Sequence, residues 1–401
     1  MTGHGTIHGM THGTGARRKV FLIAAEASGD NLGAPLMREL RAQFGDDVVF
    51  EGIGGGQMEG AGLTSLFPIG DLAIIGIAAI PAKLPLLLRR IREVTQAVLR
   101  ARPDVLVIID SPDFTHRVAR RVRRADPSIP IVNYVSPTVW VWRPGRARAM
   151  KKYVDHVLAL LPFEPAAHRE LGGPPCTYVG HPMIERLATL RPNADEQRRR
   201  DASPPVLLLL PGSRPGEIRH HMQVFGETMA TLAAQGVAVE AVLPTTPHLL
   251  PAVNAAIDSW PVRPRVVVGE DDKRAAFRIA RAALAKSGTV TLELALASVP
   301  MVTLYRGTAL EAFIARRVIR VSSIILANLV LGENVVPEFH QEACTAQNIV
   351  PLLIDLLADT TARRRQIEAF AKLDGIMGTG ALSPSQRAAQ IVIATMKRAS
   401  S

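Results

Sequence analysis

Cysteine is scarce in this chain, with only Cys176 and Cys344 among 401 residues. The two form no CxxC pair, and the histidines are not clustered at the spacing of a zinc finger. The sequence therefore supports neither a disulfide scaffold nor a structural zinc site. We expect the chain to occupy a reducing compartment.

Aromatic residues are also scarce, at 4% of the chain, although the formal net charge is +11. The sequence has no motif in which basic and aromatic residues alternate, so stacking platforms for nucleic acid are not predicted. The basic surplus lies mainly before residue 200. It favours an anionic partner, either a membrane surface or a phosphorylated substrate.

Long apolar runs are missing as well. The most apolar window, residues 72–91, is interrupted by Pro81, Lys83 and Pro85. A membrane-spanning helix needs about 20 nearly continuous apolar residues, so this window is not predicted to cross a bilayer.

The continuation of that window has the pattern of an amphipathic helix. Arginines lie on one side, which is typical of a helix at a membrane interface. An ordinary helix that packs on the core and has a solvated basic face is the alternative. The residues expected to face the membrane are Leu84, Leu87, Leu88 and Ile91.

Short β-branched runs alternate with helical patterns along most of the chain, as in βαβ units that build parallel sheets. The runs are too apolar for a sheet exposed on one face, so helices should cover both faces. The strands predicted for a first sheet are 20–25, 48–53, 105–109, 131–135 and 157–161. Those predicted for a second sheet are 206–210, 237–243, 266–268, 282–286 and 301–304.

This pattern predicts an α/β protein with two Rossmann-like parallel-sheet domains that face an interdomain cleft. The domains should span residues 19–190 and 206–383, joined by a polar linker at 191–205 that has no apolar period. Residues 1–18, rich in glycine and without an apolar signal region, are predicted to be a disordered tail. Residues 384–401 have helical spacing and could pack back across the junction.

In the second domain, a buried strand is followed by the turn Pro211-Gly212-Ser213-Arg214 and then by a helix. Ligands bind at strand ends in open α/β sheets. Gly212 would let a ligand approach the backbone, helix N–H groups could bind an anion with Ser213, and Arg214 could grip a phosphate. A structural turn with a surface arginine is the alternative.

A second turn, Ser287-Gly288-Thr289, follows another apolar strand and opens a helix in the same way. Glu293, four residues after Thr289, could bind a ribose hydroxyl while phosphate lies at the turn. Two such turns in one domain suggest a binding site for a diphosphate group. Neither matches GxxxxGK[ST], and no GxGxxG follows a strand, so P-loop phosphoryl transfer and Rossmann-type hydride transfer lack support.

In the first domain, the strand at 105–109 ends at Asp110, our candidate base for an attacking hydroxyl. Asp113 lies at the same sheet edge, but it could instead cap the following helix. The turn at residues 26–30 should border the same cleft, unless it is only a glycine-rich turn. His181 is a candidate polar contact or a structural histidine. The cleft residues expected from that turn are Glu26, Ser28, Gly29 and Asp30.

Taken together, these segments resemble the lipid-A-disaccharide synthase family, which has a GT-B fold. The resemblance extends over nearly the whole chain after Lys19, and the order and number of the matching segments make it specific. The segments that carry it are residues 26–30, 110–114, 134–140, 161–164, 211–214 and 287–289.

The resemblance implies transfer of a 2,3-diacylglucosamine unit from UDP to the 6-hydroxyl of 2,3-diacylglucosamine 1-phosphate, with inversion to a β-1,6 linkage. It implies Asp110 and Arg214 as essential residues, no metal or other cofactor, and a peripheral place at the inner face of the cytoplasmic membrane. Another UDP-sugar enzyme of the same fold, such as a UDP-N-acetylglucosamine 2-epimerase, and a non-catalytic UDP-lipid binder remain alternatives. The sequence does not determine the oligomeric state. The UDP contacts implied are Ser287, Gly288, Thr289, Glu293, Asn328, Gln341 and Glu342.

Overall fold

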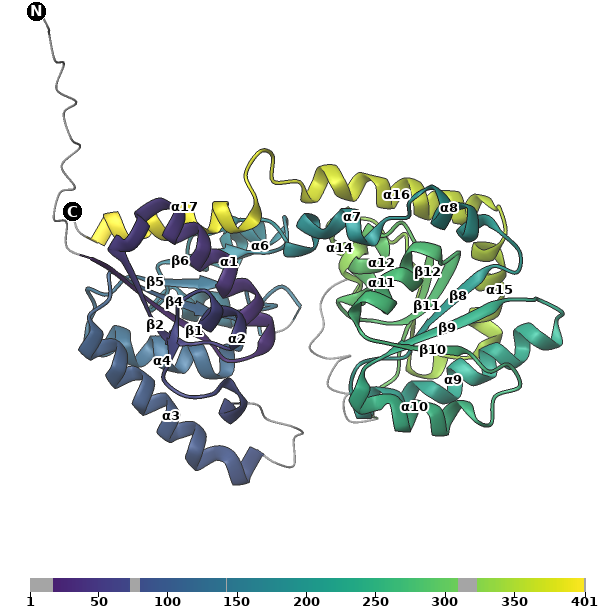
Figure 1. Cartoon of the computed structure of the whole chain (residues 1–401), viewed down its shortest axis with the longest axis horizontal. Helices are drawn as coiled ribbons and strands as arrows, with labels where there is room; N and C mark the ends of the chain where they lie inside the picture. Colours follow the sequence, from purple (N-terminus) through teal and green to yellow (C-terminus); the bar gives the residue numbers. More distant parts are fainter. Residues whose placement is uncertain (1–16, 73–79, 142, 309–322, 400–401) are drawn as a thin grey trace, which may run out of the picture.

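The computed structural model describes residues 17–72, 80–141, 143–308 and 323–399. In these residues the strands form two separate parallel sheets, of seven and six strands. Helices surround each sheet, and the two domains lie side by side (Figure 1). The predicted class, α/β with two Rossmann-like domains, is confirmed. Residues 1–16 of the predicted tail lie outside the described part of the chain, and Arg18 already belongs to the first strand.

The first sheet has the spatial order β3-β2-β1-β4-β5-β6-β7. Its strands are β1 (Arg18–Ala24), β2 (Val48–Ile53), β3 (Thr64–Ser65), β4 (Val105–Ile109), β5 (Ile131–Tyr134), β6 (His156–Ala159) and β7 (Cys176–Tyr178). Its helices are α1 (Ala27–Phe44), α2 (Gly56–Gly60), α3 (Ile80–Ala101), α4 (Pro112–Ala125), α5 (Gly145–Met150) and α6 (Glu164–Glu170). The strand order reverses between β1 and β4, which makes a topological switch point, the usual ligand-binding place in such sheets.

The second sheet has the order β10-β9-β8-β11-β12-β13, with its own switch point between β8 and β11. Its strands are β8 (Val206–Leu210), β9 (Glu240–Thr245), β10 (Arg265–Val268), β11 (Ala282–Lys286), β12 (Met301–Tyr305) and β13 (Glu338–His340). The helices around it are α7 (Leu187–Leu190), α8 (Ala194–Asp201), α9 (Pro215–Ala234), α10 (Leu250–Ile257), α11 (Glu270–Ile279), α12 (Val290–Leu296), α14 (Leu326–Leu331), α15 (Ala346–Leu357) and α16 (Thr361–Met377).

Every residue of the central strands β4 and β8 is buried, as expected for parallel sheets covered on both faces. Four predicted strands, β2, β4, β8 and β11, have the predicted bounds. Strand β9 begins three residues later than predicted. The short strands β3, β7 and β13 were not predicted, because two or three residues carry no readable alternation.

Residues 191–205, predicted as a polar linker with no apolar period, contain helix α8. Asn193 and Glu196 form a capping box at its start, which satisfies free N–H groups of the first turn. The buried Arg200 donates hydrogen bonds to the carbonyls of Phe277 and Ala297. A charged segment thus packs on the second domain through one arginine, which an apolar pattern cannot reveal.

The chain returns to the first domain at its end. Helix α16 runs along the second domain, and α17 (Pro384–Ala399) lies against the first, where it contacts α1 (Figure 1). Ala388 and Val392 of α17 are buried in a core cluster with Leu36 of α1. Burial of these side chains provides a hydrophobic attachment between the C-terminal segment and the first domain.

Candidate active site

Asp110 lies at the switch point of the first sheet, directly after β4. Its carboxylate accepts a hydrogen bond from the Ser28 hydroxyl (Oγ to Oδ2, 3.2 Å) in the first turn of α1. The sequence-predicted cleft residues Ser28 and Asp110 are therefore brought together, although they are 82 positions apart in the chain. The Asp110 side chain is partly exposed and so within reach of a substrate.

The backbone at Asp110 has an uncommon conformation. Asp110 has φ 52° and Ser111 has φ 44°, both in the left-handed region that costs an ordinary residue about 1 kcal/mol or more. Two hydrogen bonds hold the turn: the Asp110 N–H donates to the Tyr134 carbonyl (3.0 Å), and the Thr115 hydroxyl donates to the Asp110 carbonyl (2.7 Å). Strained backbone of this kind is often found at functional sites, and the Ser28 hydroxyl orients the carboxylate.

Two other residues of the 26–30 turn have structural roles. The buried carboxylate of Asp30 accepts backbone N–H groups of Gly55 (2.8 Å), Gln57 (3.0 Å) and Met58 (2.9 Å). A Cβ on Gly29 would lie 3.2 Å from the Ala24 Cβ, so glycine permits close packing of α1 on β1. These contacts give both residues structural roles, and their place in the acceptor cleft stays a prediction.

The remaining cleft candidates differ in exposure. Glu26 is exposed at the start of α1 and makes no capping hydrogen bond with its side chain. Asp113 is exposed beside Arg146, and it lies within the first turn of α4 rather than at its cap, which is Ser111. His181 is buried, and its Nδ1 accepts the Met183 N–H (3.2 Å). Burial lowers the pKa of His181 to about 4, so its imidazole is neutral at pH 7.

The turn after β8 is shaped around Glu217, which sequence analysis left without a role. Glu217 Oε2 accepts the N–H groups of Ser213 (2.9 Å) and Arg214 (3.3 Å). Gly212 has φ 134°, and a Cβ there would come within 2.5 Å of that carboxylate. The glycine is therefore required by Glu217, and the two N–H groups expected to bind an anion already have an internal acceptor.

The turn after β11 lies beside it. Lys286, the last residue of β11, places Nζ 2.9 Å from Glu217 Oε1. Thr289 and Gly288 open helix α12, and Glu293 in its first turn pairs with Lys273 of α11 (2.7 Å). The contact between Lys286 and Glu217 thus joins the two predicted anion-binding turns, and neither Lys286 nor Lys273 was singled out from the sequence.

A cavity of about 600 Å³ joins these groups. The hydroxyls of Thr245 and Thr246 in its wall are buried and have no hydrogen-bond partner among the residues that the structure describes. Three basic and three acidic side chains line it. The full lining is Leu210, Gly212, Ser213, Arg214, Glu217, Pro244, Thr245, Thr246, Pro247, Gly269, Glu270, Lys273, Lys286, Gly288, Thr289, Val290 and Glu293.

Three predicted nucleotide contacts do not line this cavity: Asn328, Gln341 and Glu342. The buried Asn328 donates to the Val336 carbonyl (3.0 Å), while its oxygen accepts the N–H groups of Val335 and Val336. Asn328 therefore has a structural role, in which α14 is tied to residues 335–336, and its assignment to the nucleotide stays a prediction. Gln341 and Glu342 lie in a short 3-10 helix at 341–343.

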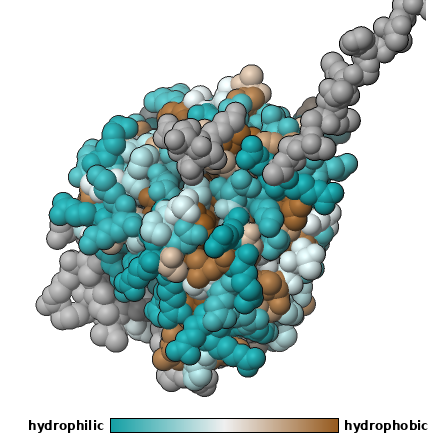
Figure 2. All heavy atoms as spheres, turned by 90° about the vertical axis from the view of Figure 1, so that its left-hand side faces the viewer, coloured by the Kyte–Doolittle hydropathy of each residue, from teal (hydrophilic) through white to brown (hydrophobic). Residues whose placement is uncertain are grey.

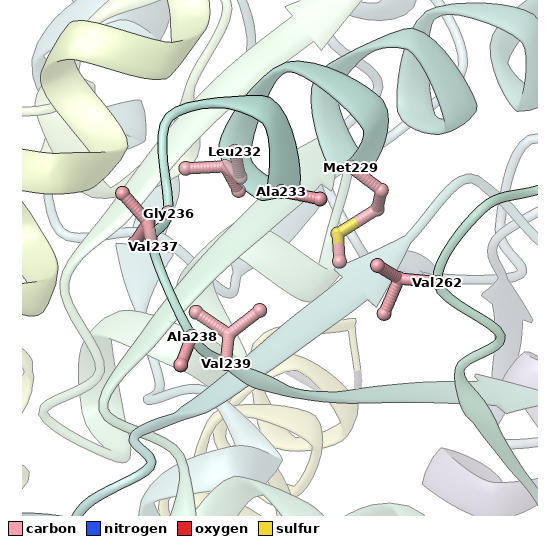
Figure 3. Close-up of a pocket in the computed structure, with 8 residues that line it drawn as sticks. All are labelled: Met229, Leu232, Ala233, Gly236, Val237, Ala238, Val239 and Val262. Carbon is pink, nitrogen blue, oxygen red and sulfur yellow. The ribbon is translucent and has the colours of Figure 1, made fainter.

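A second hollow, of about 290 Å³, lies at the other end of the second domain, where α9 ends and the chain leads into β9 (Figure 3). Met229 and Leu232 of α9 face Val239 and Val262 across it. Because its lining carries no ionisable side chain, it offers no group for acid–base chemistry or phosphate binding.

Helix α3 is amphipathic, as predicted, but its predicted membrane face is only partly exposed. Leu84 is 42% exposed, Leu87 packs partly against the first-domain core, and Ile91 is fully buried. Ile91 therefore cannot face a membrane, which corrects that part of the prediction. None of the helices in the described ranges is long and apolar enough to span a membrane.

Solved structures of low identity share this architecture. A UDP-GlcNAc 2-epimerase from Neisseria meningitidis, bound to UDP-GlcNAc, matches 95% of this chain and all of its own, with a TM-score of 0.59 and 14% identity. MurG of Acinetobacter baumannii matches 94% of this chain and 99% of its own, with a TM-score of 0.56 and 12% identity. The two parallel sheets, each with its own topological switch point, have the architecture of the GT-B fold class.

Sequence comparison narrows the class to a family. The family model for lipid-A-disaccharide synthetase matches residues 20–392. A lipid-A-disaccharide synthase of Nitrobacter hamburgensis is 65% identical over 389 residues, covering 96% of this chain and 98% of that protein. One from Rhodopseudomonas palustris is 66% identical over 386 residues, with the same coverage. The chain belongs to the lipid-A-disaccharide synthetase family, a family of glycosyltransferases, and the resemblance noted from the sequence is confirmed.

Proposed function

We propose that this chain transfers 2,3-diacylglucosamine from UDP to the 6-hydroxyl of 2,3-diacylglucosamine 1-phosphate. The acceptor oxygen forms a bond to the anomeric carbon while the bond from that carbon to the diphosphate breaks, and the electron pair leaves with UDP. The observation that carries the proposal is the cavity where both predicted anion-binding turns meet, in a chain of this family. It has the charged groups and the size that a nucleoside diphosphate needs.

Asp110 is assigned as the base that takes the proton of the acceptor hydroxyl. Its strained, partly exposed position after β4 supports this role. Arg214 is assigned to the diphosphate, with the Ser287-Gly288-Thr289 turn at the start of α12. Side chains and backbone amides supply the charge stabilisation in this mechanism, without a metal, so the activity should be unchanged by a chelator.

Incubation of the protein with both acylated sugars, followed by mass spectrometry, tests the reaction. The expected products are one disaccharide monophosphate and UDP in equal amounts. Epimerised UDP-sugar, or binding of both substrates without any product, would contradict the proposal and point to one of the two alternative functions.

We propose further that α3 places the enzyme at the inner face of the cytoplasmic membrane, where its acylated sugar substrates partition. Leu84 and Leu86 are 42% and 37% exposed, and the exposed Arg89 lies one turn further along the helix. Apolar side chains with neighbouring cations are what an anionic bilayer surface binds. Figure 2 shows that the described surface at the first-domain end is otherwise mostly hydrophilic, with small hydrophobic areas.

Replacement of Leu84 and Leu86 by Asp should weaken sedimentation with vesicles that contain anionic lipid. Leu382→Asp is the matched control, because Leu382 is 38% exposed but lies between α16 and α17. Equal vesicle binding by the double variant and the control would contradict a membrane role for α3, while leaving the transfer reaction as proposed.

A further inference from the structure

Lys286 is held directly over the anion-binding turn that follows it. A Cβ built on Gly288 would lie 3.4 Å from the Lys286 Nζ, so the ammonium is close to the start of α12. The Nζ also lies 5.5 Å from the centre of the Tyr305 ring. Only 15% of the Lys286 side chain is exposed, and it is part of the cavity wall. This cation is therefore confined to the place where an anion at the turn would lie.

Glu217 links that lysine to the other turn. One carboxylate oxygen binds Lys286, and the other binds the backbone N–H groups before α9. Burial raises the pKa of Glu217, but the hydrogen bonds from Lys286 and Ser213 outweigh it and leave the pKa below its usual value. Glu217 is thus charged at neutral pH and serves as an internal counter-ion.

The contacts of Glu217 indicate which cation can bind a phosphate in this cavity. The N–H groups of Ser213 and Arg214 are bound to Glu217, so they are not free donors. Arg214 itself is 80% exposed, with a Glu217 contact of 3.5 Å, and is free to change rotamer. Lys286 is the positioned cation. It has three ammonium hydrogens, so it can contact a phosphate oxygen while it keeps its bond to Glu217.

We propose that Lys286 binds the diphosphate of the departing nucleotide, and that Glu217 is a positioning residue that holds the lysine at the turn. The proposal rests on the proposed transfer from UDP. With Glu217 as its counter-ion, the lysine can remain buried when the cavity is empty. A diphosphate then adds the negative charge that the second cation, Arg214, neutralises.

Calorimetric titration of the full-length protein with UDP and with uridine tests the proposal, because only UDP carries the diphosphate. Lys286→Met should weaken UDP binding about 10- to 100-fold, as expected for one hydrogen bond to a charged group, and leave uridine binding unchanged. Lys286→Arg should restore part of the loss. Glu217→Gln should weaken UDP binding less than Lys286→Met, and it should raise KM for the UDP-sugar more than it lowers kcat.

The matched control is Arg274→Met, which removes a cation from α11 that pairs with Asp271 and does not line the cavity. It should leave both affinities unchanged. Unchanged UDP binding by Lys286→Met, or equal losses for UDP and uridine, would overturn the role of Lys286. If the unmodified protein binds no UDP, the proposed function itself fails, so the two failures are distinguishable.

Discussion

The two switch points have the same topology but hold their carboxylates in opposite ways. At the first, Asp110 accepts a hydrogen bond from the neutral Ser28 hydroxyl, on a backbone with two successive positive φ angles. At the second, Glu217 binds a lysine and two backbone N–H groups. A base must gain a proton during turnover, whereas a positioning residue must keep its charge. Charged donors therefore suit Glu217 and would hinder Asp110.

The largest expected effect concerns the first carboxylate. Asp110→Asn keeps the size of the side chain but removes the proton acceptor, so we expect turnover to fall about 10³-fold. UDP binding should not change, because Asp110 is in the other domain. Initial rates and calorimetry measure the two quantities. Asp46→Asn, at an exposed position just after the end of α1, is the control and should retain full activity. Near-normal turnover by Asp110→Asn would show that Asp110 is not the base, and the two carboxylates would then not differ in role.

The second effect concerns the cation at the second switch point. Arg214→Ala should lower kcat/KM about 100-fold, because charge that develops on the departing diphosphate loses one donor. Rates measured at several donor concentrations will show whether kcat or KM carries the loss. Arg219→Ala, at an exposed position one turn into α9, should behave like the parent. Equal rates for the two variants would contradict the role of Arg214.

A third comparison separates a structural carboxylate from an exposed one on the same helix. Asp30→Ala leaves three backbone N–H groups without their acceptor, so the free energy of unfolding should fall by about 3 kcal/mol. Glu26→Ala should change it by less than about 0.5 kcal/mol, because that side chain makes no capping bond. Urea unfolding followed by circular dichroism measures both. Similar losses would show that the bonds of Asp30 contribute little.

The fourth comparison is a pH dependence, and it contrasts Glu164, whose pKa is raised, with Glu217, whose pKa is lowered. Burial raises the pKa of Glu164 from 4.5 to about 7, although it accepts hydrogen bonds from Trp140 and Leu161. The folded state therefore binds more protons than the unfolded chain between these two pH values. The contribution of Glu164 to the free energy of unfolding therefore falls as pH rises through this window, because ionising the buried carboxyl costs free energy.

Glu164→Gln removes this titration. The melting temperature of the variant relative to the parent should rise between about pH 4.5 and pH 7 and then stay constant. Thermal unfolding at half-unit pH steps measures the difference. A difference that does not depend on pH would contradict the raised pKa.

Much of the fold was predictable because its strongest signals are local. The buried strands β4 and β8 are continuous apolar runs, and their bounds could be predicted to the residue. Helix α8 was missed because it packs through the buried Arg200 rather than through an apolar face. Strand β13 was missed because three residues give no period.

The candidate site was likewise predictable from the sequence only where the signal is local. The sequence by itself determined the two parallel sheets and the two turns, and placed Asp110 and Arg214 at strand ends, because apolar runs and glycine turns are local features. Only the tertiary structure decided that Asp30 and Asn328 have structural roles and that Glu217 joins Lys286 to the first turn. These roles depend on which side chains meet across the switch points. A single carboxylate has the same local sequence signal whether it binds a substrate, a lysine or a backbone amide.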